Sequence, residues 1–316
     1  MGATFEPTKS GFYKISKIYA GENWHENFRS PLTEPGIHVK AGEYILAIDG
    51  IELRADDNPY RLLVNKTGGT VELTVNNQPR IKGSRRVNIK PIPDDKKLLY
   101  YNWVKRNRDY VTEKTGGKVG YIHLPDMSEF GVSEFGKWFY GQLDKDGLII
   151  DTRFNKGGFV SDQILERINR PLLGMENNRN LSPYTYPYPV VVGPKAALTN
   201  LYAGSDGDYF AFYWKKYKLG PLIGTRTWGG VIAVRKFTPM LDGGYAYVPV
   251  GGMYDLNSKF IIENQGVKPD IEIDSLPKDV IAGKDPQLEK AIELVLKAMK
   301  DYKPRRAPKP TDYPER

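Results

Sequence analysis

Residues 147–162, GLIIDTRFNKGGFVSD, decide the fold of the larger part of this 316-residue chain. A short apolar run predicts a buried strand, and the turn with Gly157 and Gly158 leads into a segment that we expect to be a helix capped near Ser161. A strand that passes through a turn into a helix is half of a βαβ unit. The stretch therefore predicts an α/β domain.

The same alternation continues on both sides of this stretch. We expect strands over residues 117–126, 147–154 and 187–198, and helices over 128–143, 161–173, 209–219 and 285–301. In the last helix Asp285 is the expected N-cap, and Pro286 stands at the first helical position. These elements predict an α/β domain over residues 118–302, with a mixed sheet flanked by helices.

The first part of the chain, residues 1–93, has a different pattern. Short alternating or apolar runs separated by Gly, Asn and Pro predict a β-rich domain, with strands within 12–21, 43–53, 69–77 and 85–92. The run EPGIHVKAGEYILAIDGIEL (34–53) resembles a PDZ domain of the bacterial protease-associated type, in which residues 57–66 would form the helix. Such a domain binds a peptide at a sheet edge. The alternative is a small β-rich domain without a ligand. A helical connector is expected over 94–117.

Composition limits the classes of partner. The net charge is +8, but the Pro-rich basic tail, residues 303–316, has five Lys/Arg against two Asp/Glu and so carries about three of these charges. The remaining charge is dispersed, and no helix has the basic stripe of a nucleic-acid reader. No apolar stretch approaches the roughly 20 residues that a membrane span needs. We expect neither a nucleic acid nor a membrane as partner.

Residue types also limit the chemistry. The chain has no cysteine and only three histidines, which are scattered, so no metal-ligand spacing is present. No glycine-rich phosphate loop follows a strand. We therefore expect no metal and no cofactor. The first residues lack the regions of a signal peptide, and the compartment, cytoplasmic or periplasmic, stays open.

A serine stands in the segment LYAGSDGDYF, residues 201–210, just before an expected helix. The free N–H groups at a helix start would stabilise an alkoxide at Ser205 or a nearby oxyanion. The same position suits a serine that only caps the helix, with Asp206 and Asp208 complementing the helix dipole. The local pattern alone leaves both interpretations open.

The turn at Gly157 and Gly158 adds a second feature to the same domain. Glycines at the carboxyl end of a strand leave backbone N–H groups exposed, where open α/β sheets bind ligands. Such a turn can supply one half of an oxyanion hole, and the amide after a nucleophile, here that of Asp206, the other half.

Four motifs occur in a specific order: NKGGFVS (155–161), YAGSDGD (202–208), IGTRTWGG (223–230) and ENQGVKPD (263–270). In this order they resemble the carboxy-terminal half of the tricorn protease family, within the clan of tail-specific processing serine proteases. The resemblance covers nearly the whole chain. It implies a PDZ domain followed by a serine peptidase domain that acts on peptides or unfolded polypeptides, in a family that forms homo-hexamers.

The resemblance also implies roles for individual residues. Ser205 would be the nucleophile, the amides of Gly158 and Asp206 would form the oxyanion hole, and Glu263 would be the acidic member of the charge-relay set. Gly157 would contribute backbone to the substrate site. Glu176 would select basic side chains before the cleaved bond, or it is simply a solvated loop glutamate.

The proton acceptor is the open question. The lysine of the processing proteases is replaced by Gly230 here, and the guanidinium of Arg226 does not deprotonate. His25, His38 and His123 lie in contexts typical of surface or strand-packing histidines. His123 is the best candidate base of the three, because it stands at the end of an expected strand of the α/β domain, but nothing in its local sequence marks it as a base.

The resemblance implies that the base is a histidine of a helical domain that precedes the PDZ domain and is not in this chain. We therefore expect a truncated piece that is inactive or very weak alone. The alternative function is a non-catalytic module that binds peptides through its PDZ domain.

Overall fold

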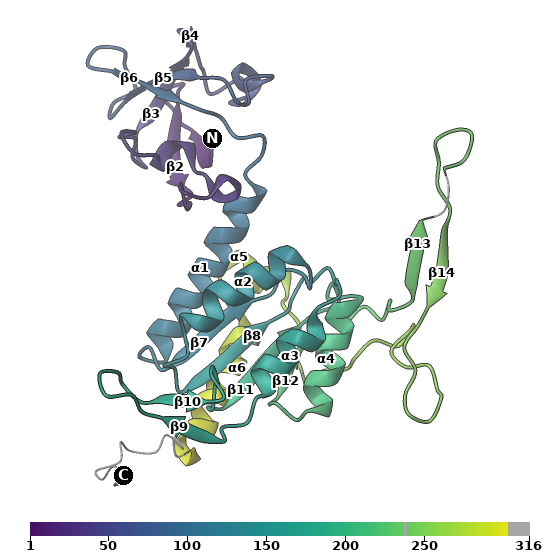
Figure 1. Ribbon diagram of the computed structural model, residues 1–316. Coiled ribbons are helices and arrows are strands. Elements are labelled where there is room, and N and C mark those ends of the chain that lie inside the picture. The colour runs from purple at the N-terminus through teal and green to yellow at the C-terminus, as the bar shows by residue number, and fades with distance from the viewer. Residues whose placement is uncertain (237–238, 303–316) are drawn as a thin grey trace. The chain divides into compact units, whose positions relative to one another are not determined.

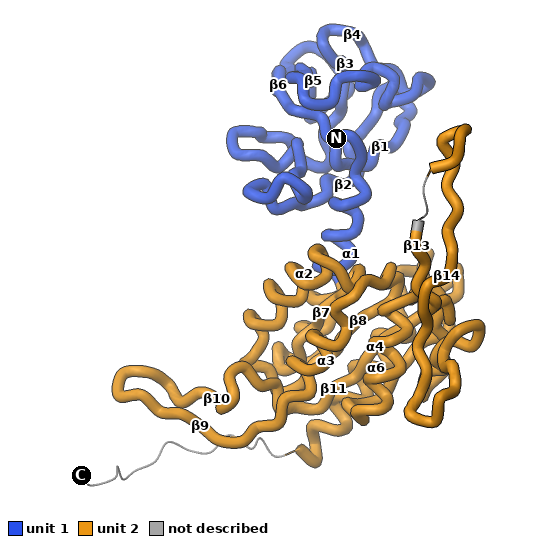
Figure 2. Tube along the Cα trace, turned by 45° about the vertical axis from the view of Figure 1, so that its right-hand side comes forward, with its two compact units in different colours: residues 1–106 blue, residues 107–316 orange. Residues whose placement is uncertain are grey.

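The computed structural model describes residues 1–236 and 239–302, so the predicted basic tail lies outside the described residues. The chain divides into two compact units, residues 1–106 and 107–316, which Figure 2 shows in different colours. Each unit has its own apolar core. Among the described residues, no helix has the length and apolar character needed to cross a membrane.

Unit 1 is the predicted β-rich part of the chain. Its strands pair antiparallel in the order β1-β2-β3-β5-β6, and β4 pairs with β3. Ile15, Ile45 and Val71 are fully buried in the core. The strands are β1 (Ala3–Pro7), β2 (Tyr13–Ile18), β3 (Tyr44–Ile48), β4 (Ile51–Glu52), β5 (Val71–Asn76) and β6 (Arg85–Ile89). Two short 3₁₀ turns, η1 (Glu26–Phe28) and η2 (Pro31–Thr33), join β2 to β3.

The helix predicted within residues 57–66 is wrong: this segment forms only a 3₁₀ turn, η3 (Arg61–Leu63). The Asp57 carboxylate accepts a hydrogen bond from the Asn58 N–H at 2.8 Å, and the Asn58 side chain accepts one from the Tyr60 N–H at 2.8 Å. Such local bonds compete with helix formation. Asn65 then takes a left-handed conformation, with φ of 60°, and ends the turn.

Unit 2 contains a parallel sheet of five strands within the described residues, in the order β15-β12-β11-β8-β7. All four strand pairs are parallel, so the prediction of an α/β domain is confirmed and the predicted mixed sheet is corrected to a parallel one. The strands are β7 (Val119–His123), β8 (Gly147–Asp151), β11 (Lys195–Thr199), β12 (Leu222–Gly224) and β15 (Ile271–Glu272).

Helices cover both faces of this sheet. In Figure 1, α2, α3 and α4 lie in front of the sheet and α6 lies behind it. The cap predicted for α6 is confirmed, because the Asp285 carboxylate accepts the Leu288 N–H at 3.0 Å. The helices are α1 (Lys96–Lys114), α2 (Glu129–Tyr140), α3 (Ser161–Asn169), α4 (Asp206–Lys216), α5 (Pro277–Ile281) and α6 (Pro286–Asp301).

Two antiparallel pairs stand outside the main sheet. After β12, the chain forms an antiparallel ribbon of β13 (Ala233–Lys236) and β14 (Tyr247–Gly251), which projects from the α/β body in Figure 1. β9 (Gly174–Glu176) and β10 (Tyr184–Tyr186) form a second hairpin.

The strand register aligns the carboxyl ends of the central strands. Asp151 of β8 pairs with Leu198 of β11, and Thr199 of β11 pairs with Gly224 of β12. The loops that follow these strands therefore leave the sheet at one edge, where parallel α/β sheets bind ligands. The loop after β8 contains the two glycines of the predicted turn, and the loop after β11 contains Ser205.

Candidate active site

Ser205 occupies the N-cap position of α4, but its hydroxyl makes no capping hydrogen bond. Its backbone has φ of 55° and ψ of −119°, a conformation that is strained for a residue with a side chain. The side chain is exposed. Ser205 therefore stands where a capping residue would stand, but its hydroxyl remains free to react.

Asp208, in the first turn of α4, anchors this start of the helix. It is fully buried, and its Oδ1 accepts hydrogen bonds from the Gly229 N–H at 2.9 Å and from the Thr227 hydroxyl. Burial raises the pKa of the Asp208 carboxyl above its usual value, although these bonds and the Ser205 amide act to lower it. Among the described residues, no group pairs with Oδ2. Asp208 therefore fixes the segment 227–229 against the helix start.

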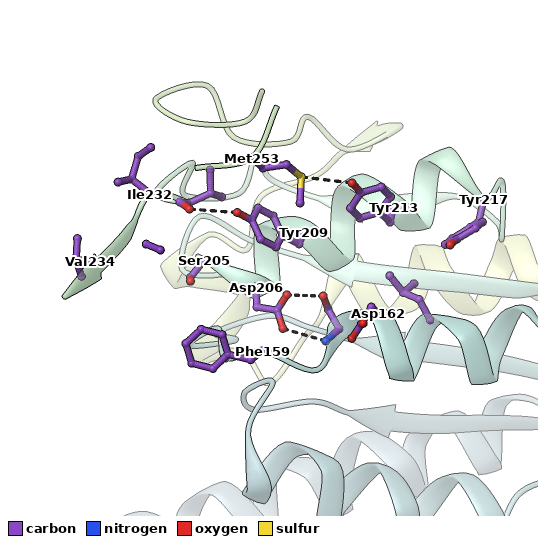
Figure 3. Close-up of a pocket in the computed structure, with 15 residues that line it drawn as sticks. Phe159, Asp162, Ser205, Asp206, Tyr209, Tyr213, Tyr217, Ile232, Val234 and Met253 are labelled. Atoms are coloured by element: carbon purple, nitrogen blue, oxygen red, sulfur yellow. Dashed lines mark hydrogen bonds between the residues drawn. The ribbon is translucent and has the colours of Figure 1, made fainter. Parts of the chain in front are cut away.

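Asp206 ties the amino ends of two helices together. Its carboxylate accepts hydrogen bonds from the Ser161 N–H at 2.9 Å and from the Ser161 hydroxyl, as the dashed lines in Figure 3 show. The predicted cap at Ser161 is therefore corrected. Val160 is the N-cap of α3, and the Ser161 hydroxyl donates to Asp206 instead of capping the helix. The positive ends of the α3 and α4 dipoles converge beside Ser205.

Asn155 joins the glycine loop to the loop that contains Ser205. It is fully buried, and its Oδ1 accepts the Gly157 N–H at 2.9 Å. Its backbone carbonyl accepts the Gly204 N–H at 3.0 Å, and its amide nitrogen donates to the Leu124 carbonyl at 2.8 Å. The backbone of Asn155 thus joins the two loops, and its buried side chain holds that backbone in place.

Both glycines of this loop are required by close contacts. At Gly157, with φ of 78°, an added Cβ would lie 2.6 Å from the Cβ of Ser205. At Gly158 a Cβ would lie 1.8 Å from the Met127 carbonyl oxygen. Among the described residues, neither the Gly158 nor the Asp206 backbone N–H has a hydrogen-bond acceptor. The predicted oxyanion-hole residues are therefore brought together around Ser205 as two free donors.

Gly158, Ser205 and Asp206 line one pocket of about 600 Å³. Figure 3 shows Tyr209, Tyr213 and Tyr217 along one side of it; the first two lie on successive turns of α4, and Tyr217 is its C-cap residue. The remaining lining residues are Phe159, Ser161, Asp162, Leu165, Val231, Ile232, Ala233, Val234 and Met253. This Ser205 pocket is mostly apolar and large enough for the side chain of a peptide.

A strap of residues 227–232 crosses beside Ser205. The Ser205 N–H donates to the Gly230 carbonyl at 3.1 Å, and the Tyr209 hydroxyl donates to the Val231 carbonyl at 3.2 Å. Burial and the nearby Asp206 carboxylate raise the pKa of Tyr209, so its hydroxyl keeps its proton. The strap is therefore fixed on its α4 side.

Glu263 fixes the strap from the other side. Its Oε2 accepts the Val231 N–H at 2.7 Å and the Ile232 N–H at 2.9 Å. Its Oε1 has no hydrogen bond to the described residues. A carboxylate with one oxygen held by two amides and the other open is suited to orient an imidazole.

The structure does not bring Glu176 to this pocket. Glu176 lies in the β9–β10 hairpin, where its carboxylate accepts a hydrogen bond from the Tyr184 hydroxyl. That bond raises the pKa of Tyr184. Glu176 is exposed and is not among the residues that line the Ser205 pocket.

No histidine lines the Ser205 pocket either. His123 is buried, its Nε2 lies 2.9 Å from the Arg153 carbonyl oxygen, and burial lowers its pKa. His25 and His38 belong to unit 1, where the His25 Nδ1 accepts the Asn27 N–H. Within the described residues, no group of three His, Asp or Glu side chains could hold a metal ion.

Comparisons with known proteins match both units. The family model described as "Tricorn protease PDZ domain" matches residues 1–94, and the model "Peptidase family S41" matches residues 118–273. A PDZ domain followed by a peptidase domain of family S41 is therefore the class of protein that the fold and the site define.

Relatives narrow this class. The chain is 42% identical over 302 residues to a "Putative Tricorn-like protease C-terminal subunit" of Sulfurisphaera tokodaii, covering 95% of this chain and 34% of the relative. It is 39% identical over 316 residues to the tricorn protease of Thermoplasma acidophilum, covering 96% of this chain and 29% of that protein. A crystal structure of the tricorn protease matches with a TM-score of 0.88 at 39% identity, over 95% of this chain and 29% of that one. The chain belongs to the tricorn protease family, and it spans about a third of the length of these relatives.

Proposed function

We propose that this chain carries the nucleophile and the oxyanion hole of a serine peptidase that cleaves peptides or unfolded polypeptides. The main support is the arrangement around Ser205. Its hydroxyl makes no capping hydrogen bond, the backbone N–H groups of Gly158 and Asp206 have no acceptor among the described residues, and all three residues line the same apolar pocket. Ser205 Oγ would attack the carbonyl carbon, and the resulting oxyanion would accept hydrogen bonds from both amides. Collapse expels the amine and leaves an acyl-enzyme, which water hydrolyses.

We further propose that the proton acceptor is a histidine outside these 316 residues, oriented by Glu263. The support is local: no histidine lines the Ser205 pocket, and the family's alternative lysine position is Gly230. The open Oε1 of Glu263 is the group that would hold the imidazole. The chain alone is then expected to react slowly, because the oxyanion hole and binding alone give only a residual rate.

Chemical rescue tests both proposals on the chain as it is. We expect a fluorophosphonate probe to label Ser205 slowly, and free imidazole at millimolar concentration to raise the labelling rate at least about tenfold, since general-base catalysis contributes at least that much. The increase in labelling rate should be proportional to the concentration of neutral imidazole, and it should be smaller in the Glu263→Gln variant. Glu293→Gln, at an exposed position on α6, is the matched control.

Two results would contradict these proposals separately. Labelling that persists in Ser205→Ala removes the peptidase assignment. Fast labelling without imidazole, unchanged when imidazole is added, means that the base lies within the chain and removes only the external histidine.

A further inference from the structure

A second pocket opens at the same edge of the parallel sheet. It has a volume of about 480 Å³ and is formed by the loops after β8, β11, β12 and β15. Its lining residues are Arg153, Phe154, Asn200, Leu201, Tyr202, Thr225, Arg226, Glu272, Asp274, Ser275, Val280 and Gln287. Glu272 of β15, Val280 of α5 and Gln287 of α6 complete this lining.

The two pockets lie toward opposite faces of the sheet. The Ser205 pocket is lined by residues of α3 and α4, which cover one face, and the second pocket by Val280 of α5 and Gln287 of α6, the helix on the other face (Figure 1). The nucleophile loop contributes to both, with Ser205 in one lining and Tyr202 in the other. A polypeptide crossing the sheet edge at Ser205 can therefore extend into both pockets.

A pair of exposed aromatic rings forms one wall of the second pocket. The rings of Phe154 and Tyr202 stack with centroids 5.5 Å apart and planes at 16°. Phe154 is 51% exposed and Tyr202 is 69% exposed, and Leu201 beside them is exposed as well. Contiguous exposed apolar side chains of this kind mark a surface that binds another chain.

The backbone holds this ring pair in place. Asn200 is only 8% exposed, and its Oδ1 accepts the Phe154 N–H at 2.9 Å and the Tyr202 N–H at 3.1 Å. Phe154 has φ of 63°, a left-handed conformation that is strained for a residue with a side chain. Strain at a residue that stays exposed indicates a role for the ring outside the core.

The ring pair and the catalytic loops are one assembly. Phe154 directly precedes Asn155, whose carbonyl accepts the Gly204 N–H next to the nucleophile. Tyr202 stands three residues before Ser205 on the same loop. A ligand on the rings is thus positioned by the same loops that position the hydroxyl.

We propose that the second pocket binds the part of a polypeptide substrate on the leaving-group side of the cleaved bond, with Phe154 and Tyr202 as the wall for an apolar side chain. This inference rests on the peptidase function proposed above. A cleaved polypeptide continues on both sides of the scissile bond, and the Ser205 pocket takes only one side. Arg226, Glu272 and Asp274 in the lining supply polar groups for the peptide backbone.

Binding to a Ser205→Ala chain tests the inference without turnover. The probe is fluorescein-labelled oxidised insulin B chain, an unfolded polypeptide, and the dissociation constant is measured by fluorescence anisotropy. We expect the double variant Phe154→Ala/Tyr202→Ala to bind about tenfold more weakly, the usual effect of losing aromatic anchors. Tyr140→Ala, an equally exposed aromatic on α2 outside both pockets, is the matched control and should bind unchanged.

A second measurement separates the two sides of the cleaved bond. An alkyl fluorophosphonate that has reacted with Ser205 occupies the acyl side and leaves the leaving-group side empty. In chains fully labelled in this way, the double variant should still bind the fluorescein-labelled polypeptide about tenfold more weakly than its parent. Equal binding by the two labelled chains overturns the assignment to that side.

The remaining outcomes are also decisive. If the double variant binds like its parent while Tyr217→Ala in the Ser205 pocket binds more weakly, the inference fails and the peptidase function stands. If the parent does not bind the probe, the inference fails, and absent labelling of Ser205 would then remove the proposed function as well. A change in association state of the double variant in sedimentation would make the surface a contact between copies and would overturn the inference.

Discussion

At the scale of single residues, the site depends on a contact that admits no side chain. Gly157 lies so close to the nucleophile that an added Cβ would stand 2.6 Å from the Ser205 Cβ and 3.1 Å from its Oγ. The Gly204 carbonyl would lie 3.0 Å away. Since Asn155 ties both loops together, neither loop can withdraw without breaking its buried hydrogen bonds.

Gly157→Ala is therefore expected to damage the site more than it damages the fold. The left-handed backbone costs about 1–2 kcal/mol in stability, while displacement of Ser205 should slow fluorophosphonate labelling at least about tenfold, as small misplacements of reacting groups do. Gly283→Ala is the control, because Gly283 has φ of 72° and open space around it. Urea unfolding gives the stability and probe labelling the rate. Equal labelling of the two variants would show that the contact does not position the nucleophile.

The sequence was sufficient to single out most residues of the candidate site, but it could not decide whether each has a structural or a chemical role. A serine before a helix suits a cap as well as a nucleophile, and only the strained φ of Ser205 and its missing capping bond separate the two. The bonds of Asp208 to Gly229 and of Asn155 to Gly204 were not predicted, because these partners are fixed by tertiary contacts. For Asp208 the sequence suggested only a carboxylate that complements the helix dipole. The one available signal was that Asp208 and Asn155 are both short polar residues beside the glycines of the motifs.

At the scale of elements, β11 begins with a charge that the fold partly buries. Lys195 is the first residue of this central strand, and its Nζ donates to the Gly193 carbonyl at 3.2 Å. Burial lowers the pKa of Lys195 to about 8. Between about pH 8 and the usual lysine value of 10.5, Lys195 binds more protons in the unfolded chain than in the folded one. The free energy of unfolding therefore rises with pH across this window, and below about pH 8 the full destabilisation by Lys195 is present.

Lys195→Met should remove this cost. We expect the free energy of unfolding at pH 7 to increase by about 1–3 kcal/mol, because each unit of pKa shift is worth roughly 1.4 kcal/mol, and the gain to shrink as the pH approaches 10.5. Urea unfolding at pH 7, 9 and 10.5 measures the trend, with Lys297→Met at an exposed position of α6 as the control. A gain that grows with pH would contradict the assigned direction.

Elements with a clear period were predicted well, and irregular ones were not. The apolar spacing and the cap of α6 were sufficient to define that helix, and the run before Gly157 defined β8. The sequence of the strap, residues 227–232, has neither the period of a helix nor that of a strand. Its hydrogen bonds go to Asp208, Tyr209 and Glu263 rather than to a neighbouring strand. The ribbon of β13 and β14 lies outside the strands that were predicted, and a local alternation of side chains does not specify which strand will pair with which.

At the scale of the whole molecule, the two cores share no residue. The core cluster of unit 1 is drawn from residues 1–89, and that of unit 2 from residues 122–267. Ser205, Gly158, Asp206 and Glu263 all belong to unit 2, as do the residues that fix them. Separate cores are the physical basis of independently folding domains.

A chain that starts at Asp94 should therefore retain the site. This start keeps α1 intact, including the Asp94 carboxylate that accepts the Lys96 N–H at 3.0 Å. We expect residues 94–316 to unfold in one cooperative transition, to label at Ser205 within about twofold of the full chain, and to keep the imidazole rescue, because the groups that make the oxyanion hole are unchanged. Circular dichroism and the labelling rate measure these properties. A folded fragment whose Ser205 no longer reacts would mean that unit 1 takes part in the chemistry, and the site would then have to be redrawn to include it.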